Sequence, residues 1–297
     1  MHAYLIFAHK NLDQLPRLID RLDTGAATFF LHIDKKTDTT PYKGELGMLG
    51  SLPNLHFVRR HHCPWAAFGL VEAQRSAMER ALAEGGFTHL MMITGEDYPL
   101  RPGHEIDSLF AAHPGISFIR YNPGRTKEEK TKLQRYRYKS WHLYLAGKWW
   151  VVPARRLKKI GIKRRIPGRL RPVKGLAFFA ASYEATEYAL RFYQQNPHYV
   201  RFWRHAKHAD EYFWHTILLN SPLSDRVSNT RLRYTRYISS TGHGATFGEE
   251  NLDELKAAST DHFFAKRFDV TMDPAILDLV DRELLQDRRE PESSWPV

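Results

Sequence analysis

The feature that most constrains the fold is a pair of short, continuous apolar segments at residues 3–8 and 28–33. An apolar run of this length without polar alternation is typical of a parallel strand that is buried on both faces. Between the two segments, residues 12–22 repeat Leu and Ile at the spacing of one helical face. A strand, a helix and a strand within about 30 residues predict a nucleotide-binding α/β unit.

The rest of the chain continues this alternation. The apolar patterns predict strands at 55–58, 89–94, 176–181 and 232–238, and helices at 66–83, 184–195, 210–219, 249–258 and 274–286. In open α/β sheets, ligands bind beyond the carboxyl ends of the strands, which here are the loops after Ala8, Ile33 and Thr94. A length of 297 residues suits a single α/β domain.

The net charge indicates which kinds of partner to expect, and the cysteine content indicates the cellular compartment. The chain has 44 Lys and Arg against 33 Asp and Glu, and this net charge of +11 favours anionic partners. Nucleic acid is not expected, because no recognised nucleic-acid-binding module accompanies the charge. Cys63 is the only cysteine, which is typical of a reducing compartment. No apolar run approaches the roughly 20 residues of a membrane span, and a strand already begins at residue 3, so we expect a cytoplasmic protein.

A basic segment at 154–174 carries ten Lys and Arg and no acidic residue. One interpretation is a solvated surface loop. The other is a binding surface for an acidic glycan, a lipid-linked phosphate or the anionic inner face of a membrane. The sequence leaves both open, so peripheral membrane contact is one of its predictions.

Four motifs follow one another in a specific order. They are HIDKK at 32–36, GEDYPL at 95–100, DEYFWHT at 210–216 and FFAKRFD at 263–269. With these motifs, the chain resembles the core-2/I-branching β-1,6-N-acetylglucosaminyltransferase and peptide O-xylosyltransferase family, which is glycosyltransferase family 14. The absence of a membrane anchor and of disulfides favours a bacterial-type member.

The resemblance implies an α/β fold of the GT-A type, with a mixed central sheet flanked by helices. A Rossmann-like nucleotide-binding half would occupy 1–119, and the acceptor-binding and catalytic half would occupy 120–297 of one domain. It also implies an inverting, metal-independent reaction with a UDP-sugar donor and a glycan or glycolipid acceptor. No Asp-x-Asp motif is present, so neither a metal nor another cofactor is expected, and fixed Lys and Arg would balance the diphosphate.

Four residues match the catalytic and diphosphate positions of that family. Glu211 matches the catalytic base and is expected in the first turn of its helix, where the alternative is a carboxylate favoured by the helix dipole. Lys266 matches the lysine that holds the donor diphosphate. Arg233 is the better match to its partner arginine, and Arg236 is the competing one.

Further residues match nucleotide and sugar contacts. Asp34 resembles the aspartate that contacts the uridine, and Ala8 and His9 would lie beside the base. Trp65 is expected to line the donor site or to pack in the core. Residues expected to contact the donor or acceptor sugar are Glu96, Asp97 and Trp214, with a structural turn as the alternative for Asp97.

The donor sugar stays open in the sequence. Ala177 stands where the xylosyl branch carries an additional aspartate, which favours GlcNAc, whereas the segment 213–222 is more similar to the xylosyl branch. The alternatives are therefore a UDP-xylose-dependent xylosyltransferase and a non-catalytic polyanion- or glycan-binding protein derived from a transferase.

Overall fold

The protein is built around one mixed sheet. The structure, a computed structural model, describes residues 1–123, 140–145, 148–153, 166–237 and 244–286. Seven strands form the main sheet in the order β12-β6-β11-β4-β1-β2-β3. Strands β1, β2, β3 and β4 are parallel, whereas β11 runs antiparallel to both β4 and β6. The strands are β1 (His2–Ala8), β2 (Ala27–Ile33), β3 (Leu55–Phe57), β4 (His89–Thr94), β6 (Ser117–Phe118), β11 (Ala180–Ser182) and β12 (Val227–Ser228).

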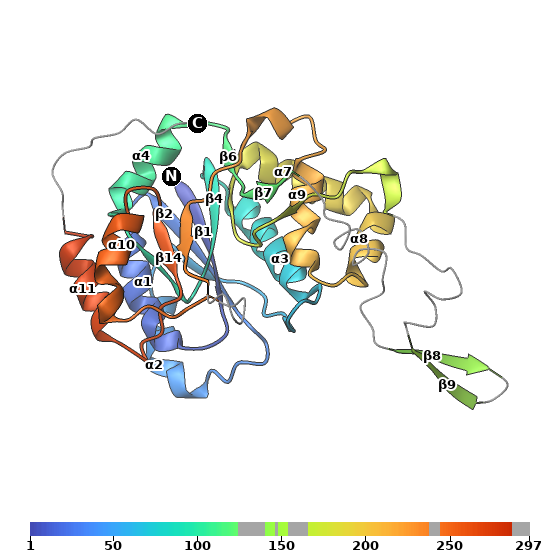
Figure 1. The fold of residues 1–297 in the computed structure, drawn as a ribbon, viewed down its shortest axis with the longest axis horizontal. Helices are drawn as coiled ribbons and strands as arrows, with labels where there is room; N and C mark the ends of the chain where they lie inside the picture. The colour runs from blue at the N-terminus through green and yellow to red at the C-terminus, as the bar shows by residue number, and fades with distance from the viewer. Residues whose placement is uncertain (124–139, 146–147, 154–165, 238–243, 287–297) are drawn as a thin grey trace.

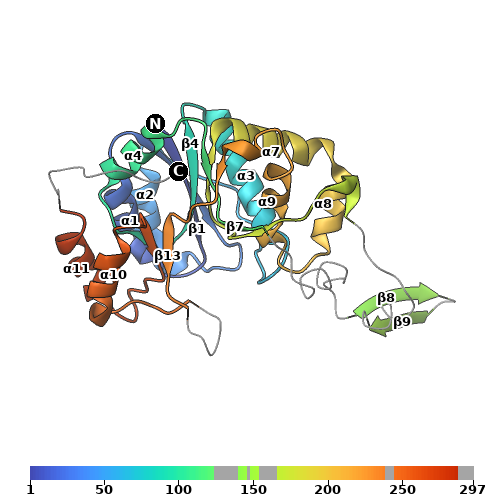
Figure 2. The same ribbon diagram turned by 45° about the horizontal axis from the view of Figure 1, so that its top comes forward.

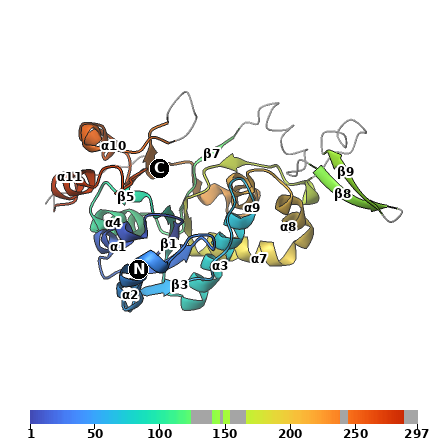
Figure 3. The ribbon, with the colours of Figure 1, turned by 90° about the horizontal axis from the view of Figure 1, so that it is seen from below.

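Helices cover both faces of this sheet (Figures 1 and 3). One layer consists of α1 (Leu15–Leu22), α2 (Lys43–Gly50), α4 (Gly103–Ala112), α10 (Leu252–Ala258) and α11 (Ala275–Glu283). The other consists of α3 (Gly69–Glu84), α7 (Tyr183–Gln195), α8 (Pro197–Arg204) and α9 (Phe213–Leu218). Short 3₁₀ helices lie at Leu12–Gln14, Thr40–Tyr42, Pro167–Arg169, Ala209–Glu211, Ser224–Arg226 and Glu249–Asn251.

The continuous apolar strands are explained by a hydrophobic core on each face. Tyr4 and Ile6 of β1 point into the core beneath α1 and α4, whereas Leu5 and Phe7 point into the core beneath α3 and α7. Side chains of a strand alternate between the two faces of its sheet, so a strand buried on both faces must be apolar at every position.

A second, three-stranded sheet lies on the α10 side of the main sheet (Figure 2). Its strands are β13 (Arg233–Thr235), β14 (Phe264–Lys266) and β5 (Asp97–Pro99). Lys266 is in register with Asp97 on one side and with Thr235 on the other. Two antiparallel pairs complete the strands, β7 (Tyr121–Asn122) with β10 (Lys174–Gly175), and β8 (Ser140–Leu145) with β9 (Lys148–Pro153).

The predicted α/β architecture, with a Rossmann-like first half and a mixed sheet between helices, is confirmed. Several elements differ from the prediction. The strand expected at 232–238 is only β13, and the helix expected at 249–258 begins as the 3₁₀ turn Glu249–Asn251. The helix expected at 210–219 is a 3₁₀ turn at Ala209–Glu211 followed by α9, and the strand expected at 176–181 is only β11. The sequence prediction also missed α2, α4 and α8. Most of the basic segment 154–174 lies outside the described residues.

The loop before α3 comes very close to the start of that helix. A Cβ atom at Gly69 would overlap the carbonyl oxygen of His62 and lie 3.0 Å from Cα of Cys63. Both contacts involve backbone atoms, so a side chain at this position can be accommodated only if the loop moves. The absence of a side chain at Gly69 thus allows the loop 62–68 to pack against the start of α3.

We expect Gly69→Ala to lower the free energy of unfolding by about 1–3 kcal/mol, the usual cost of overpacking. Gly47→Ala is the matched control, because a Cβ there meets no atom within 4 Å and Gly47 lies inside α2. This control should be neutral or up to about 1 kcal/mol stabilising. Urea denaturation measures both, and equal stabilities of the two variants would contradict the close approach.

Candidate active site

A cavity of about 260 Å³ lies at the carboxyl ends of β1, β2 and β4, where the fold predicts a ligand site. Among its lining residues are Ala8, His9, Asp34, Trp65 and Lys266, all singled out by the sequence. The structure therefore brings together residues that lie up to 258 positions apart in the chain. Which part of a ligand each of them contacts stays a prediction.

Asp34 is buried at the end of β2 and ties two loops together. Its Oδ1 accepts a hydrogen bond from the backbone N–H of Lys36 at 3.0 Å, and its Oδ2 accepts one from the N–H of Cys63 at 3.3 Å. Burial raises the pKa of the Cys63 thiol to about 12, and the nearby Asp34 adds to this effect. The thiol is therefore protonated at neutral pH, as expected for a structural cysteine.

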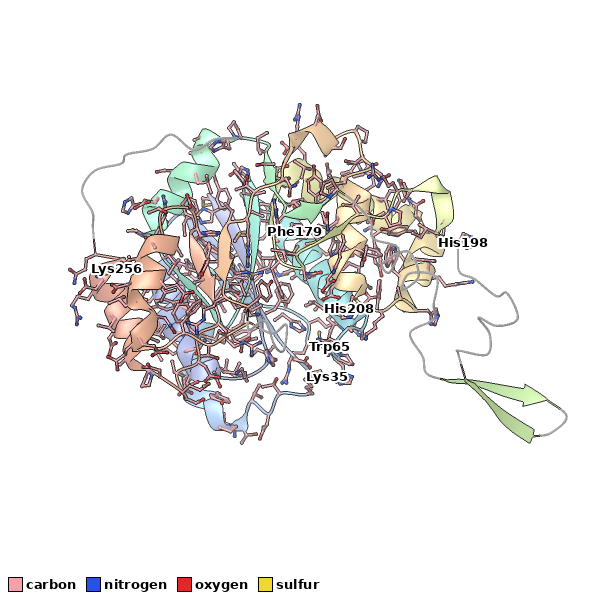
Figure 4. The ribbon with its side chains drawn as sticks, in the orientation of Figure 1. Lys35, Trp65, Phe179, His198, His208 and Lys256 are labelled. Atoms are coloured by element: carbon pink, nitrogen blue, oxygen red, sulfur yellow. The ribbon has the colours of Figure 1, made fainter. Side chains whose placement is uncertain are left out.

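Trp65 stands at the mouth of the cavity with 72% of its surface exposed. Its ring lies 5.0 Å from the ring of His208 in an edge-on contact, and Nζ of Lys207 lies 5.0 Å from its centroid. Figure 4 shows Trp65 next to His208. The backbone N–H of His208 donates to the carbonyl of Ala66 at 3.1 Å, and this bond joins the two loops.

Glu96 is the centre of an ion-pair cluster next to the cavity. Its carboxylate lies 3.1 Å from Nζ of Lys10, 3.6 Å from Nζ of Lys266 and 3.1 Å from Nε of Arg267. The Glu96 side chain is almost fully buried, and a buried carboxylate needs such partners. Lys10 also pairs with Asp269 at 2.6 Å.

Asp97 organises the neighbouring turn. Its Oδ2 accepts hydrogen bonds from the N–H and the hydroxyl of Thr94, so the predicted structural turn is present. The same carboxylate pairs with Nη1 of Arg233 at 3.1 Å. The guanidinium of Arg233 and Nζ of Lys266 lie 5.2 and 5.5 Å from the centre of the Phe178 ring. Phe178 lines the cavity, so both cations lie beside it.

Burial lowers the pKa of Lys266, and the positive charge of Arg233 adds to this, while Asp97 and Glu96 oppose it. A negatively charged group bound beside these two cations would relieve their mutual repulsion. Among the described residues, the four cations Lys10, Arg233, Lys266 and Arg267 pair with three carboxylates, those of Glu96, Asp97 and Asp269, so the cluster retains positive charge for an anionic ligand.

Glu211 does not lie in the first turn of an α-helix, as the sequence predicted, but ends the 3₁₀ turn Ala209–Glu211. The turn is set by His208, which has a left-handed backbone with φ of 56°. The Glu211 side chain is 32% exposed, and its Oε2 lies 3.2 Å from Nζ of Lys174 on β10. Its Oε1 lies 3.9 Å from Nδ1 of His208. A partly exposed carboxylate at this position can accept a proton from an incoming hydroxyl.

Asp210, next to Glu211, faces the cavity instead. Burial raises the pKa of Asp210 to about 6, and the adjacent Glu211 charge adds to the rise. Its Oδ1 is buried without a hydrogen-bond partner among the described residues. Sequence reasoning missed Asp210, Lys10 and Lys174 as site residues. The signal for Lys10 was its place just after β1, and Lys174 was included only as the last residue of the basic segment 154–174.

Two predicted residues lie elsewhere. Trp214 is fully buried in the core, and its indole N–H donates to Oε1 of Gln74 at 2.9 Å. The structure thus gives it a packing role instead of the predicted sugar contact. Arg236 pairs with Glu254 at 3.1 Å on the surface and does not join the cluster, whereas Arg233 does.

Two further searches cover only the described part of the chain. No helix there is both long and apolar enough to cross a membrane. No three His, Cys, Asp or Glu side chains come together there in a way that could hold a metal ion.

Comparison with known proteins gives a family match and distant relatives. The family model "Branch: Core-2/I-Branching enzyme" matches residues 2–259. Xylosyltransferase 2 of Rattus norvegicus is 22% identical over 95% of this chain and 33% of its own length. A β-1,3-galactosyl-O-glycosyl-glycoprotein β-1,6-N-acetylglucosaminyltransferase of Bos taurus is 24% identical over 72% of this chain and 48% of its own. The chain thus spans a third to a half of the length of these relatives.

Similarity to solved structures is low. Mouse xyloside xylosyltransferase 1 in its apo form aligns with 89% of this chain and 96% of its own, at 13% identity and a TM-score of 0.38. Residues 1–349 of S. aureus TarS, solved in complex with UDP-GlcNAc, align with 56% of this chain and 49% of their own, at 12% identity and a TM-score of 0.30.

The raised pKa of Asp210 generates a prediction for stability. Because the folded-state pKa of about 6 lies above the ordinary 3.8, the carboxyl contributes stability at low pH that is lost as pH rises through about 6. We compare the free energy of unfolding of Asp210→Asn with that of the parent protein. This difference should shift in favour of the variant by about 2 kcal/mol when the pH is raised from 4.5 to 7.5. Urea denaturation at both pH values measures the difference. The exposed Asp253→Asn should show no such gain, and a pH-independent effect of Asp210→Asn would contradict the assignment.

Proposed function

The chain belongs to the Core-2/I-branching enzyme family of glycosyltransferases, and on this premise we propose that it is an inverting, metal-independent transferase. It would transfer a sugar from a UDP-sugar to a hydroxyl of a glycan or glycolipid acceptor. We propose GlcNAc as the first candidate for this sugar and xylose as the second. The observation that carries the proposal is the placement of Arg233 and Lys266 by the small sheet beside the cavity, with Glu211 adjacent to the cavity residue Asp210.

The nucleotide would occupy the cavity at the carboxyl ends of the strands. Asp34 would contact the uridine, with Ala8 and His9 beside the base and Trp65 covering the opening. The diphosphate would extend toward Lys266 and Arg233. Both cations are already held in place by buried carboxylates, so little reorganisation is needed when the ligand binds.

The chemical step follows from these positions. Glu211 takes the proton from the acceptor hydroxyl while the acceptor oxygen forms a bond to the anomeric carbon. The bond between that carbon and the diphosphate oxygen breaks on the opposite face, which inverts the configuration. UDP leaves with its electron pair and its added charge, which Lys266 and Arg233 stabilise in the place of a divalent cation.

Two alternatives stay in view. The curated relatives include both xylosyl- and N-acetylglucosaminyltransferases, so xylose is the second candidate sugar. A non-catalytic polyanion- or glycan-binding protein is the third candidate. A partly exposed Glu211 next to the cavity residue Asp210, together with Lys266 lining the same cavity, favours an enzyme over such a binder.

Glu211→Gln should leave UDP affinity nearly unchanged, because Glu211 does not line the nucleotide cavity. Turnover should fall roughly a hundred- to ten-thousand-fold, since the amide cannot accept the proton. UDP release from a panel of UDP-sugars with mixed glycan acceptors measures turnover, and calorimetry measures UDP binding. Glu187→Gln, on the exposed face of α7, is the matched control. Normal turnover in Glu211→Gln would exclude this residue as the base.

Activity should persist in EDTA, since the proposed charge stabilisation comes from Arg233 and Lys266. UDP release with and without chelator measures this, and added Mg²⁺ or Mn²⁺ should change the rate less than about twofold if no metal bridges the diphosphate. Loss of activity in EDTA with recovery on metal addition would refute the charge argument. Lys266→Met should weaken UDP binding under both conditions.

A further inference from the structure

Arginines in the first half of the chain are mostly paired with acids. Arg17 pairs with Asp278 and Asp281, Arg75 with Glu72 and Arg101 with Glu105. The pairing keeps that surface close to neutral. The region around β7 and β10 shows a different pattern, because its arginines have no carboxylate within 4 Å among the described residues.

Two of these arginines, Arg120 and Arg171, are exposed, and within the described part of the chain their guanidiniums hydrogen-bond to carbonyl oxygens. Nη1 of Arg120 lies 3.3 Å from the carbonyl oxygen of Asn229, and Nη2 of Arg171 lies 2.6 Å from that of Pro123. A carbonyl oxygen orients a guanidinium but leaves its charge uncompensated. Arg171 and Pro123 flank the paired strands β7 and β10, so both charges belong to one short ribbon.

Arg231 adds a third uncompensated charge behind this ribbon. Its Nε and Nη2 are buried without a hydrogen-bond partner among the described residues. Burial lowers the pKa of Arg231, Tyr237 opposes the shift, and the positive charges of Arg233 and Arg120 add to it. Arg120, Arg231 and Arg233 line one small cavity together with Phe178. Positive charge therefore continues from the diphosphate cations to the ribbon.

The ribbon also carries the partner of the proposed base. Lys174 of β10 pairs with Glu211, and the N–H of Leu176, two residues on, donates to the carbonyl of Arg120 at 3.1 Å. Arg120 and Glu211 are thus connected through one short segment. Glu211 therefore meets the ribbon through Lys174, whereas its neighbour Asp210 lines the cavity.

We propose that the acceptor carries an anionic group, a carboxylate or a phosphate, which binds Arg120 and Arg171 on the β7–β10 ribbon while its hydroxyl reaches Glu211. This inference rests on the proposed transferase function and specifies its acceptor class. Neither guanidinium has a carboxylate partner among the described residues, and each has further N–H groups that can form charge-assisted hydrogen bonds, which are about twice as strong as neutral ones. Arg231 increases the local positive potential without needing to contact the group.

The test uses full-length protein saturated with UDP and titrated by calorimetry. The probes are a glucuronate-terminated disaccharide, the corresponding 6-phosphate and the neutral, carboxyl-reduced disaccharide. We expect at least one of the charged probes to bind at least about tenfold more tightly than the neutral probe. This preference should weaken as the salt concentration rises. Arg120→Gln with Arg171→Gln should reduce the preference to less than about twofold.

Matched variants separate charge from structure. Arg120→Lys should keep part of the preference, and Arg191→Gln, which removes an exposed arginine of α7, should keep all of it. Equal binding of all three probes, no binding of any, or a preference that survives the double Gln variant would each overturn the acceptor proposal while UDP binding leaves the transferase proposal standing. Failure of the parent protein to bind UDP would instead contradict the transferase proposal.

The last part of the test measures binding to lipid vesicles. Cosedimentation with phosphatidylcholine vesicles, with and without phosphatidylglycerol, tests whether the same arginines bind a membrane. If the double Gln variant loses only vesicle binding and keeps its glucuronate preference, the ribbon is a membrane surface and the acceptor proposal is wrong. Loss of the saccharide preference with unchanged vesicle binding supports it.

Discussion

The buried carboxylate of Glu96 is the constraint on which the site depends. Glu96 lies in the turn between β4 and β5, whereas its partners Lys10, Lys266 and Arg267 come from the loop after β1 and from the end of β14. A buried charge without partners is costly, so docking of the segment 263–269 stabilises this turn. The N–H of Phe268 donates to the Glu96 carbonyl at 2.9 Å and reinforces this docking. The cluster therefore links the two ends of the chain and places Lys266 beside the cavity.

Docking of β14 also determines where β13 lies. Arg233 pairs in register with Phe264, and its guanidinium reaches Asp97 of β5. One small sheet thus orients both cations from strands, which hold side chains more rigidly than loops do. The loops contribute the aromatic side, where the left-handed residues Ala66 and His208 are joined by a backbone hydrogen bond and the rings of Trp65 and His208 are in contact. Lys266 from a strand and Trp65 and Asp210 from loops therefore line one cavity.

The sequence predicted the local parts of this arrangement well. Strands β1, β2 and β4 and helix α7 begin and end within two residues of the prediction. Their apolar residues form long patterns with a clear strand or helix period. The start of the helix expected at 210–219 was wrong, because α9 begins only at Phe213 and periodicity could not show that His208 adopts a left-handed backbone. Trp214 was misplaced because helical spacing does not tell which face is the core. The ion pairs of Glu96 and Asp97 join residues 86 to 171 positions apart, and no local pattern encodes them.

The adjacent carboxylates Asp210 and Glu211 differ in burial and in the residues they face because of their surroundings. Asp210 and Glu211 share one 3₁₀ turn, yet burial raises the pKa of Asp210 to about 6 while its side chain faces the cavity. Glu211 points to the other side, where it is partly exposed and meets Lys174. The 3₁₀ turn is what separates them, because successive side chains there project about a third of a turn apart. The left-handed backbone of His208 comes directly before this turn, and it therefore helps to set which carboxylate faces the cavity and which one meets Lys174 of the ribbon.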